Sequence, residues 1–148
     1  MRLIFVLIML ALAGCASTPQ ASRERDSEAR QFGSSPAAAT VYVYRPNGAR
    51  DDPDPVLWVD GRLIGATLPY AYFRVHLDPG RHLFTGMAAD NGRLELDTRP
   101  GEIYFVAQIV TGGQSHFQPV KPEIGRKVLT NCCSLLENWT PGQRPLLR

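Results

Sequence analysis

Three histidines are the side chains in this 148-residue chain that most resemble metal ligands: His76, His82 and His116. Imidazole nitrogens bind zinc and other transition metals. His76 and His82 flank residues 78–80, Asp-Pro-Gly, which are typical of a tight turn. A two-residue turn places the two histidines on opposite faces of a sheet, because neighbouring positions alternate; a three-residue loop would bring them together. We therefore expect no metal site and no cofactor, and a structural role for His82 in its hairpin.

Adjacent thiols offer a second kind of chemistry at Cys132 and Cys133. Adjacent Cα atoms lie about 3.8 Å apart, below the usual range for a disulfide of about 4.4–6.8 Å. The sequence favours two reduced, buried cysteines that act as small apolar residues. A strained disulfide between them, an intermolecular bond and a redox role are the alternatives.

The chain contains no recognisable motif for nucleophilic catalysis. The sequence contains no Gly-x-Ser-x-Gly elbow and no Cys-His pair in a recognisable frame. Residues 111–115, "TGGQS", are rich in glycine but lack the lysine and the spacing of a phosphate-binding loop. We therefore expect no catalytic residues and a protein that is not an enzyme.

Aromatic and basic residues recur at alternate positions of two predicted strands. If these side chains face outward on one sheet, they form a surface for a partner, a sugar or a membrane. The alternative is that a second layer, such as a C-terminal helix, covers them. The candidate interaction surface comprises Tyr42, Tyr44, Tyr70, Tyr72, Arg45 and Arg74.

Cys15 follows an apolar run, residues 3–13, that begins just after Arg2. The run is too short to span a membrane, which takes about 20 residues, and it is typical of a secretory signal. Residues 12–15, Leu-Ala-Gly-Cys, resemble the bacterial lipobox, which implies cleavage before Cys15 and lipidation of that thiol. Cleavage before Gly14 and a cytoplasmic chain are the alternatives. The residue after the cysteine is alanine rather than aspartate. In lipoproteins of enterobacterial type, this favours the periplasmic face of the outer membrane.

Charge gives no reason to expect nucleic acid as a partner. Without residues 1–14 the chain carries 15 basic and 14 acidic side chains, one fewer basic than the full sequence, and a nearly neutral protein does not attract a polyanion.

Residues 15–38 contain a single aromatic residue, Phe32, and no aliphatic side chain larger than alanine. Such a segment buries too little apolar surface to fold. We expect a flexible tether with a reach of about 25 Å.

Short apolar runs alternate with turn signals after residue 39, in the pattern of an all-β sandwich or barrel. Phe73, Val75 and Leu77 alternate with polar or aromatic neighbours and are expected to face inward. Asp60-Gly61 predicts a hairpin turn. Residues 102–110, apolar on both faces, predict a central strand, and Pro119 predicts an edge strand. The expected strands are 40–46, 56–59, 62–68, 70–77, 81–88, 93–97, 102–110 and 116–120.

Helical spacing of apolar residues replaces the alternation after Pro122 and predicts a short helix over about 123–136. The expected fold is therefore an antiparallel β-sandwich of about seven or eight strands with a C-terminal helix. The expected organisation is a signal peptide at 1–14, a tether at 15–38 and one domain at 39–148.

Four segments in order resemble an uncharacterised family of small bacterial lipoprotein domains: "VYVYRP", "VDGRLIG", "LDPGRHLF" and "GEIYFVA". That family is related to the repeat domains named after the tetrad Pro-Glu-Gly-Ala, although the tetrad is absent here. The resemblance covers about residues 39–130 and implies a small β-sandwich on a lipid anchor, with no assigned activity.

The location and fold class together favour a binding or scaffolding module in the periplasm. Its expected partners are the membrane, through the lipid, and an envelope protein or the cell wall. The alternative is an accessory subunit of an envelope transport or secretion assembly.

Overall fold

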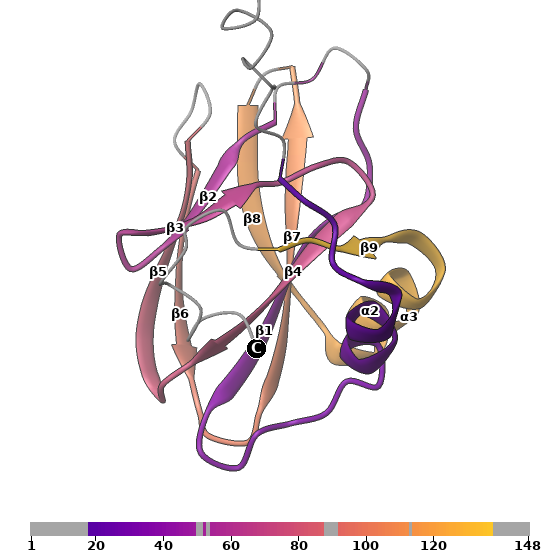
Figure 1. Cartoon of the computed structure of the whole chain (residues 1–148). Coiled ribbons are helices and arrows are strands. Elements are labelled where there is room, and N and C mark those ends of the chain that lie inside the picture. Colours follow the sequence, from indigo (N-terminus) through magenta and orange to yellow (C-terminus); the bar gives the residue numbers. More distant parts are fainter. Residues whose placement is uncertain (1–17, 50–51, 53, 88–91, 113, 138–148) are drawn as a thin grey trace, which may run out of the picture.

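Two β-sheets pack face to face, and two short helices cover the outer face of one of them (Figure 1). The computed structural model describes residues 18–49, 52, 54–87, 92–112 and 114–137. The described elements are α2 (Arg23–Ala29), β1 (Ala39–Arg45), β2 (Val56–Val59), β3 (Arg62–Ala66), β4 (Ala71–Leu77), β5 (Gly80–Met87), β6 (Arg93–Thr98), β7 (Ile103–Thr111), β8 (Gln114–Val120), α3 (Pro122–Cys132) and β9 (Ser134–Leu135). The expected all-β sandwich with a C-terminal helix is confirmed.

The strand order is β8-β7-β1-β4-β9 in the first sheet and β3-β2-β5-β6 in the second. Most neighbouring strands are antiparallel, but β1 runs parallel to β7 and β9 runs parallel to β4. The chain leaves the first sheet after β1 for β2 and β3, returns as β4, leaves again for β5 and β6, and then returns to the other side of β1 as β7. The expectation of purely antiparallel pairing is therefore wrong for these two pairs.

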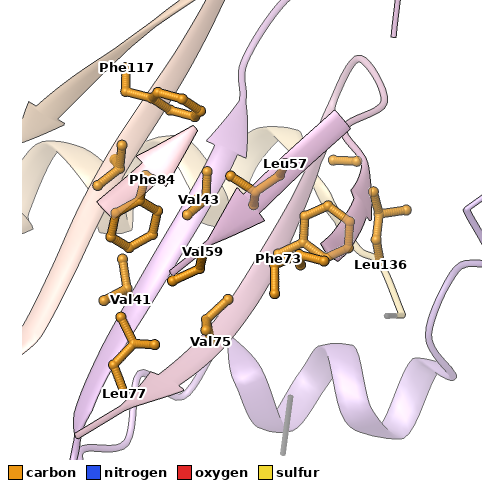
Figure 2. Packing of buried hydrophobic residues seen from close by; sticks show 13 residues of the cluster. Val41, Val43, Leu57, Val59, Phe73, Val75, Leu77, Phe84, Phe117 and Leu136 are labelled. Atoms are coloured by element: carbon orange, nitrogen blue, oxygen red, sulfur yellow. The ribbon is translucent and has the colours of Figure 1, made fainter. Parts of the chain in front are cut away.

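Alternation along the strands fills the space between the sheets, as the sequence predicts. Phe73 and Val75 are fully buried and Leu77 is 2% exposed. They pack with residues of the opposite sheet such as Leu57 and Phe84 in one apolar cluster (Figure 2). Burying side chains of this size from both sheets supplies the main favourable term for the fold.

Turn residues behave as expected between β2 and β3. Asp60 and Gly61, between β2 and β3, have φ values of 51° and 75°. A type I′ hairpin requires a positive φ at both positions.

Strand β7 lies between β8 and β1, and β8 with Pro119 forms an edge of its sheet. The predicted central and edge strands are both confirmed.

The segment 78–80 does not close the expected hairpin. Strand β4 pairs with β1 and β9, whereas β5 pairs with β2 and β6, so the chain crosses here from one sheet to the other. The turn residues suit this crossing as well as a flat hairpin, since they fix only the local bend. The register that the sequence suggested around His76 and His82 is therefore wrong.

Residues 18–38 are packed against the sandwich, so the expected tether is wrong for this part of the chain. Ser22 caps α2 by accepting a hydrogen bond of 3.3 Å from the N–H of Arg25. Ala29 is fully buried, and its carbonyl accepts a hydrogen bond of 2.7 Å from the hydroxyl of Tyr42. Phe32 adds an aromatic contact to the same surface, with ring centroids 5.4 Å from Tyr42 and 5.7 Å from Phe105.

Helix α3 is shorter than expected, because Cys133 is extended and the next two residues form β9. Pro122 begins the helix, where its missing N–H costs nothing. Gly125 lets α3 approach β7 closely: a Cβ there would lie 2.2 Å from Cγ of Phe105. Among the described residues, no helix has the length and apolar character needed to cross a membrane.

Candidate functional site

The predicted aromatic surface is largely buried. Tyr42, Tyr44 and Tyr72 are 0%, 3% and 1% exposed, because α2 and α3 lie over the outer face of the first sheet (Figure 1). The prediction that these three tyrosines form an open surface is wrong, and the alternative of a covering second layer describes them.

These tyrosines join the helices to the sheet. The ring of Tyr42 stacks on Phe105 with centroids 5.2 Å apart and meets the edge of Phe32 at 5.4 Å. Desolvation by burial raises the pKa of both Tyr42 and Tyr44 above the ordinary value. For Tyr72, burial is the main cause of a larger upward shift in pKa, and the hydrogen bond to Asp26 adds to it. The neutral phenol is therefore favoured over the phenolate in all three tyrosines.

The two arginines of the predicted surface also have partners within the fold. Arg74 forms an ion pair of 3.2 Å with Glu28 of α2. The side chain of Arg45 is fully buried, and its Nη1 donates to Oδ1 of Asp54 at 2.9 Å and to the carbonyl of Thr67 at 3.1 Å. Its Nη2 lies 3.9 Å from Asp52. Arg45 thus fixes the loop after β1 rather than presenting a charge to a partner, and the prediction of an interaction role for its side chain is wrong.

Tyr70 is the member of the predicted set that the structure exposes. It is 55% exposed, and Ile124 is the other large apolar residue of the described chain that is exposed to a similar extent. Its φ of 57° is uncommon for a residue with a bulky side chain. Two backbone hydrogen bonds hold this conformation: Tyr70 N–H donates to Arg45 O at 2.9 Å, and Ser134 N–H donates to Tyr70 O at 3.0 Å. Uncommon backbone conformations of this kind are enriched at functional sites.

Beside Tyr70, the end of the sandwich carries a shallow, open hollow of about 480 Å³. We call it the Tyr70 hollow. Its walls come from the loop after β1, from Tyr70 just before β4, and from the end of β7 with the glycine that follows it. The lining residues are Asn47, Gly48, Ala49, Asp52, Tyr70, Val110, Thr111 and Gly112.

Contacts within the fold hold the loop that lines one side of the Tyr70 hollow. Oδ2 of Asp52 accepts a hydrogen bond of 2.9 Å from the N–H of Ala49, which closes the loop on itself. Gly48 lies so close to Pro69 and Arg45 that a Cβ would stand 2.6 Å from Cγ of Pro69. An aromatic ring, an amide, a carboxylate and a hydroxyl are thus gathered around one concave surface. Sequence reasoning recognised a loop here but did not connect it to Tyr70 or Thr111, because only the fold brings them together.

Gln108 lies two residues before Val110 on β7, inside the sandwich. It is fully buried, and neither atom of its amide has a hydrogen-bond partner among the described residues. A buried polar group without a partner costs about 1–3 kcal/mol. It is a feature that the pattern of apolar residues did not reveal.

The histidines are separated by the fold. His76 on β4 lies 3.3 Å from Oγ1 of Thr40, through Nδ1, and His116 is exposed on β8. His82 on β5 lies 2.6 Å from Oδ2 of Asp60 and 2.7 Å from the carbonyl of Asp78. His82 thereby joins the β2–β3 turn to the crossing between sheets. In the part of the chain that the structure describes, no group of three or more His, Cys, Asp or Glu is placed to hold a metal.

Cys132 and Cys133 are joined by a disulfide, with Cα atoms 3.7 Å apart. The favoured interpretation, two reduced thiols, is therefore wrong, and the alternative of a bond between neighbours is the one observed. Cys133 is 1% exposed, whereas Cys132 retains partial exposure. Cys15, the predicted lipidation site, lies outside the described residues.

Comparison with known proteins gives one distant relative of unknown function. The chain is similar to an uncharacterised protein from Haemophilus influenzae, with 28% identity over 135 residues, which cover 87% of this chain and 80% of that protein. No family model matches the chain. No solved structure gives a significant match.

Proposed function

We propose that this protein is a lipid-anchored module of the bacterial envelope that binds a sugar-like polar ligand in the Tyr70 hollow. The anchor is lipidated Cys15, and the location is the periplasmic face of the outer membrane. In this proposal the protein belongs with the small lipoprotein domains that its sequence resembles. The binding site lies at the loop end of the sandwich rather than on the sheet face first expected.

The anchor would hold the domain close to the membrane. Thr18 is 3% exposed, and its hydroxyl donates a hydrogen bond of 2.9 Å to the carbonyl of Ala66. Cys15 precedes Thr18 by three residues, and three extended residues span about 10 Å at most. The domain would therefore be held within about 10 Å of the lipidated residue, in place of the 25 Å expected from a long tether.

The chemistry of the Tyr70 hollow supports a polar, uncharged ligand. The exposed ring of Tyr70 offers a flat apolar surface, and Asn47, Asp52 and Thr111 offer groups that donate or accept hydrogen bonds. Sugars combine an apolar ring face with hydroxyl groups that need both kinds of partner. The exposed, conformationally constrained Tyr70 is the single observation that carries this part of the proposal.

The anchor is tested by labelling cells with radioactive palmitate. We expect label on the wild-type protein and none on a Cys15→Ser variant, which should move to the soluble fraction. An unlabelled wild-type protein that fractionates like the variant would refute the anchor.

The hollow is tested by retention of the purified protein on isolated cell walls. We expect Tyr70→Gly to lose retention without losing stability, because glycine adopts a positive φ at no steric cost, and Tyr70→Phe to keep it. Ile124→Ser is the matched control, since it removes the other exposed apolar side chain without touching the hollow. Equal retention of all four proteins would refute the site. Recovery in a defined multi-protein complex from mild detergent, without cell-wall retention, would instead support an accessory subunit.

A further inference from the structure

The disulfide stands at a junction between two elements. Helix α3 ends at Cys132, Cys133 is extended, and β9 begins at Ser134. Beyond the junction, β9 is attached to β4 by two backbone hydrogen bonds: Ser134 N–H to Tyr70 O at 3.0 Å and Leu136 N–H to Tyr72 O at 2.8 Å. The sulfur pair is thus one residue away from a contact that fixes Tyr70.

Contacts other than the disulfide hold the end of α3 in place. Linking two adjacent residues closes almost no loop, so it restricts the unfolded chain very little. The end of α3 is held instead by Arg30 of α2, whose Nη1 donates to Leu129 O at 2.5 Å and to Thr130 O at 3.2 Å. Nη2 of Arg30 also donates to Cys133 O. The bond can therefore open while the helix stays in place.

The two cysteines differ in exposure. Cys132 is partly exposed, whereas Cys133 is buried among the aromatic residues beneath the helices. Cys132 is therefore the residue of the pair that an incoming thiolate can approach. A neutral thiol of Cys133 fits its apolar surroundings, because buried cysteine behaves as a small apolar side chain.

We propose that Cys132–Cys133 is a thiol–disulfide exchange site for a dithiol protein of the envelope, and that its opening loosens β9 and the Tyr70 hollow. In the first step a thiolate of the dithiol attacks Cys132 Sγ; the Cys132–Cys133 bond breaks and Cys133 Sγ takes up a proton. In the second step the other thiol of the dithiol attacks its own mixed-disulfide sulfur and releases Cys132 as a thiolate, which is protonated in water. Two electrons pass to the cysteine pair, and the dithiol becomes a disulfide. The effect on the hollow rests on the proposed function; the exchange itself does not.

The test uses the full-length, membrane-extracted protein, with dithiothreitol as the dithiol and an alkylating reagent followed by mass spectrometry. We expect reduction without denaturant, with alkylation of Cys132 faster than that of Cys133. Hydrogen exchange at the amides of Ser134 and Leu136 should rise severalfold on reduction. The doubly substituted C132S/C133S protein should show the fast exchange at all times and no response to dithiothreitol.

A disulfide that resists dithiothreitol until the domain unfolds would overturn the exchange site. Reduction that leaves hydrogen exchange at Ser134 and Leu136 unchanged would overturn the proposed loosening of β9. Alkylation at Cys15 would contradict the lipid anchor and leave the exchange site standing. Unaltered cell-wall retention after reduction, with faster exchange at β9, would remove only the link to the hollow.

Discussion

The hydroxyl of Tyr72 on β4 donates a hydrogen bond of 2.9 Å to Oδ1 of Asp26 on α2, 46 residues earlier in the chain. The same oxygen accepts a hydrogen bond of 2.9 Å from the N–H of Leu135 at β9, and Oδ2 pairs with Arg30 at 2.8 Å. One carboxylate thus joins the N-terminal helix, the first sheet and the last strand. The contact explains why a polar N-terminal segment is part of the folded domain.

Replacing Asp26 by asparagine should lower the free energy of unfolding by about 1–3 kcal/mol. The amide nitrogen cannot accept the hydrogen bonds that the carboxylate receives, so donors that are partly buried lose a partner. Urea denaturation followed by circular dichroism measures the change. Asp97→Asn is the control, because Asp97 lies on the surface with 76% of its side chain exposed and should shift stability little. Equal effects at the two positions would contradict the role of Asp26.

Alkaline pH should destabilise the protein through Tyr72. Its pKa is raised in the folded state, mainly by burial, so the folded protein holds the phenol proton more tightly than the unfolded chain does. The contribution to stability is fully present below pH about 10, where an ordinary phenol titrates, and is lost as pH rises above that value. We expect Tyr72→Phe to lose stability less steeply than wild type above pH 10 in pH-dependent denaturation. Parallel curves for the two proteins would argue against this linkage.

Close packing of α3 on β7 depends on Gly125. Replacing it with alanine should cost about 1–3 kcal/mol, because the added methyl group would overlap the ring of Phe105 and force the helix outward. Thermal unfolding gives the comparison. The same substitution at Gly33, where a Cβ meets no atom within 4 Å, is the control and should change stability by less than about 0.5 kcal/mol. A Gly125→Ala protein as stable as the control would mean that α3 shifts freely.

Gln108→Met should stabilise the domain by about 1–2 kcal/mol. The methionine side chain is of similar length and removes two buried polar atoms that have no hydrogen-bond partner among the described residues. The midpoint of urea denaturation reports the effect, and Gln118→Met on the exposed side of β8 is the matched control. A loss of stability at position 108 would show that the amide makes a hydrogen bond in the folded protein.

Local patterns in the sequence were sufficient for strands β1 to β8, whereas β9 lies where a helix was expected. The alternation around Phe73 and Val75 identifies the inward face of β4, since a strand exposes its two faces in turn. Asp60-Gly61 identifies the hairpin, because the type I′ turn needs two residues that tolerate positive φ. These inferences succeed because each depends on neighbours in the chain.

No local pattern in the sequence predicted that helix α2 covers the first sheet. Helix α2 buries only Ala29 completely, so its sequence looks like that of a solvated segment. Its attachment depends on Tyr42 and Asp26, which find partners far away in the chain. The same packing buries Tyr42, Tyr44 and Tyr72 of the candidate interaction surface and leaves Tyr70 exposed.

The sequence by itself determined the strand faces, the turn at Asp60 and the all-β class, because side-chain alternation and turn geometry are set within a few residues. Tertiary structure alone decided that β1 pairs in parallel with β7, that β9 pairs with β4, and that Tyr70 shares a hollow with Thr111. These relationships join segments tens of residues apart, and their energy comes from surfaces that exist only once both sheets and both helices have assembled.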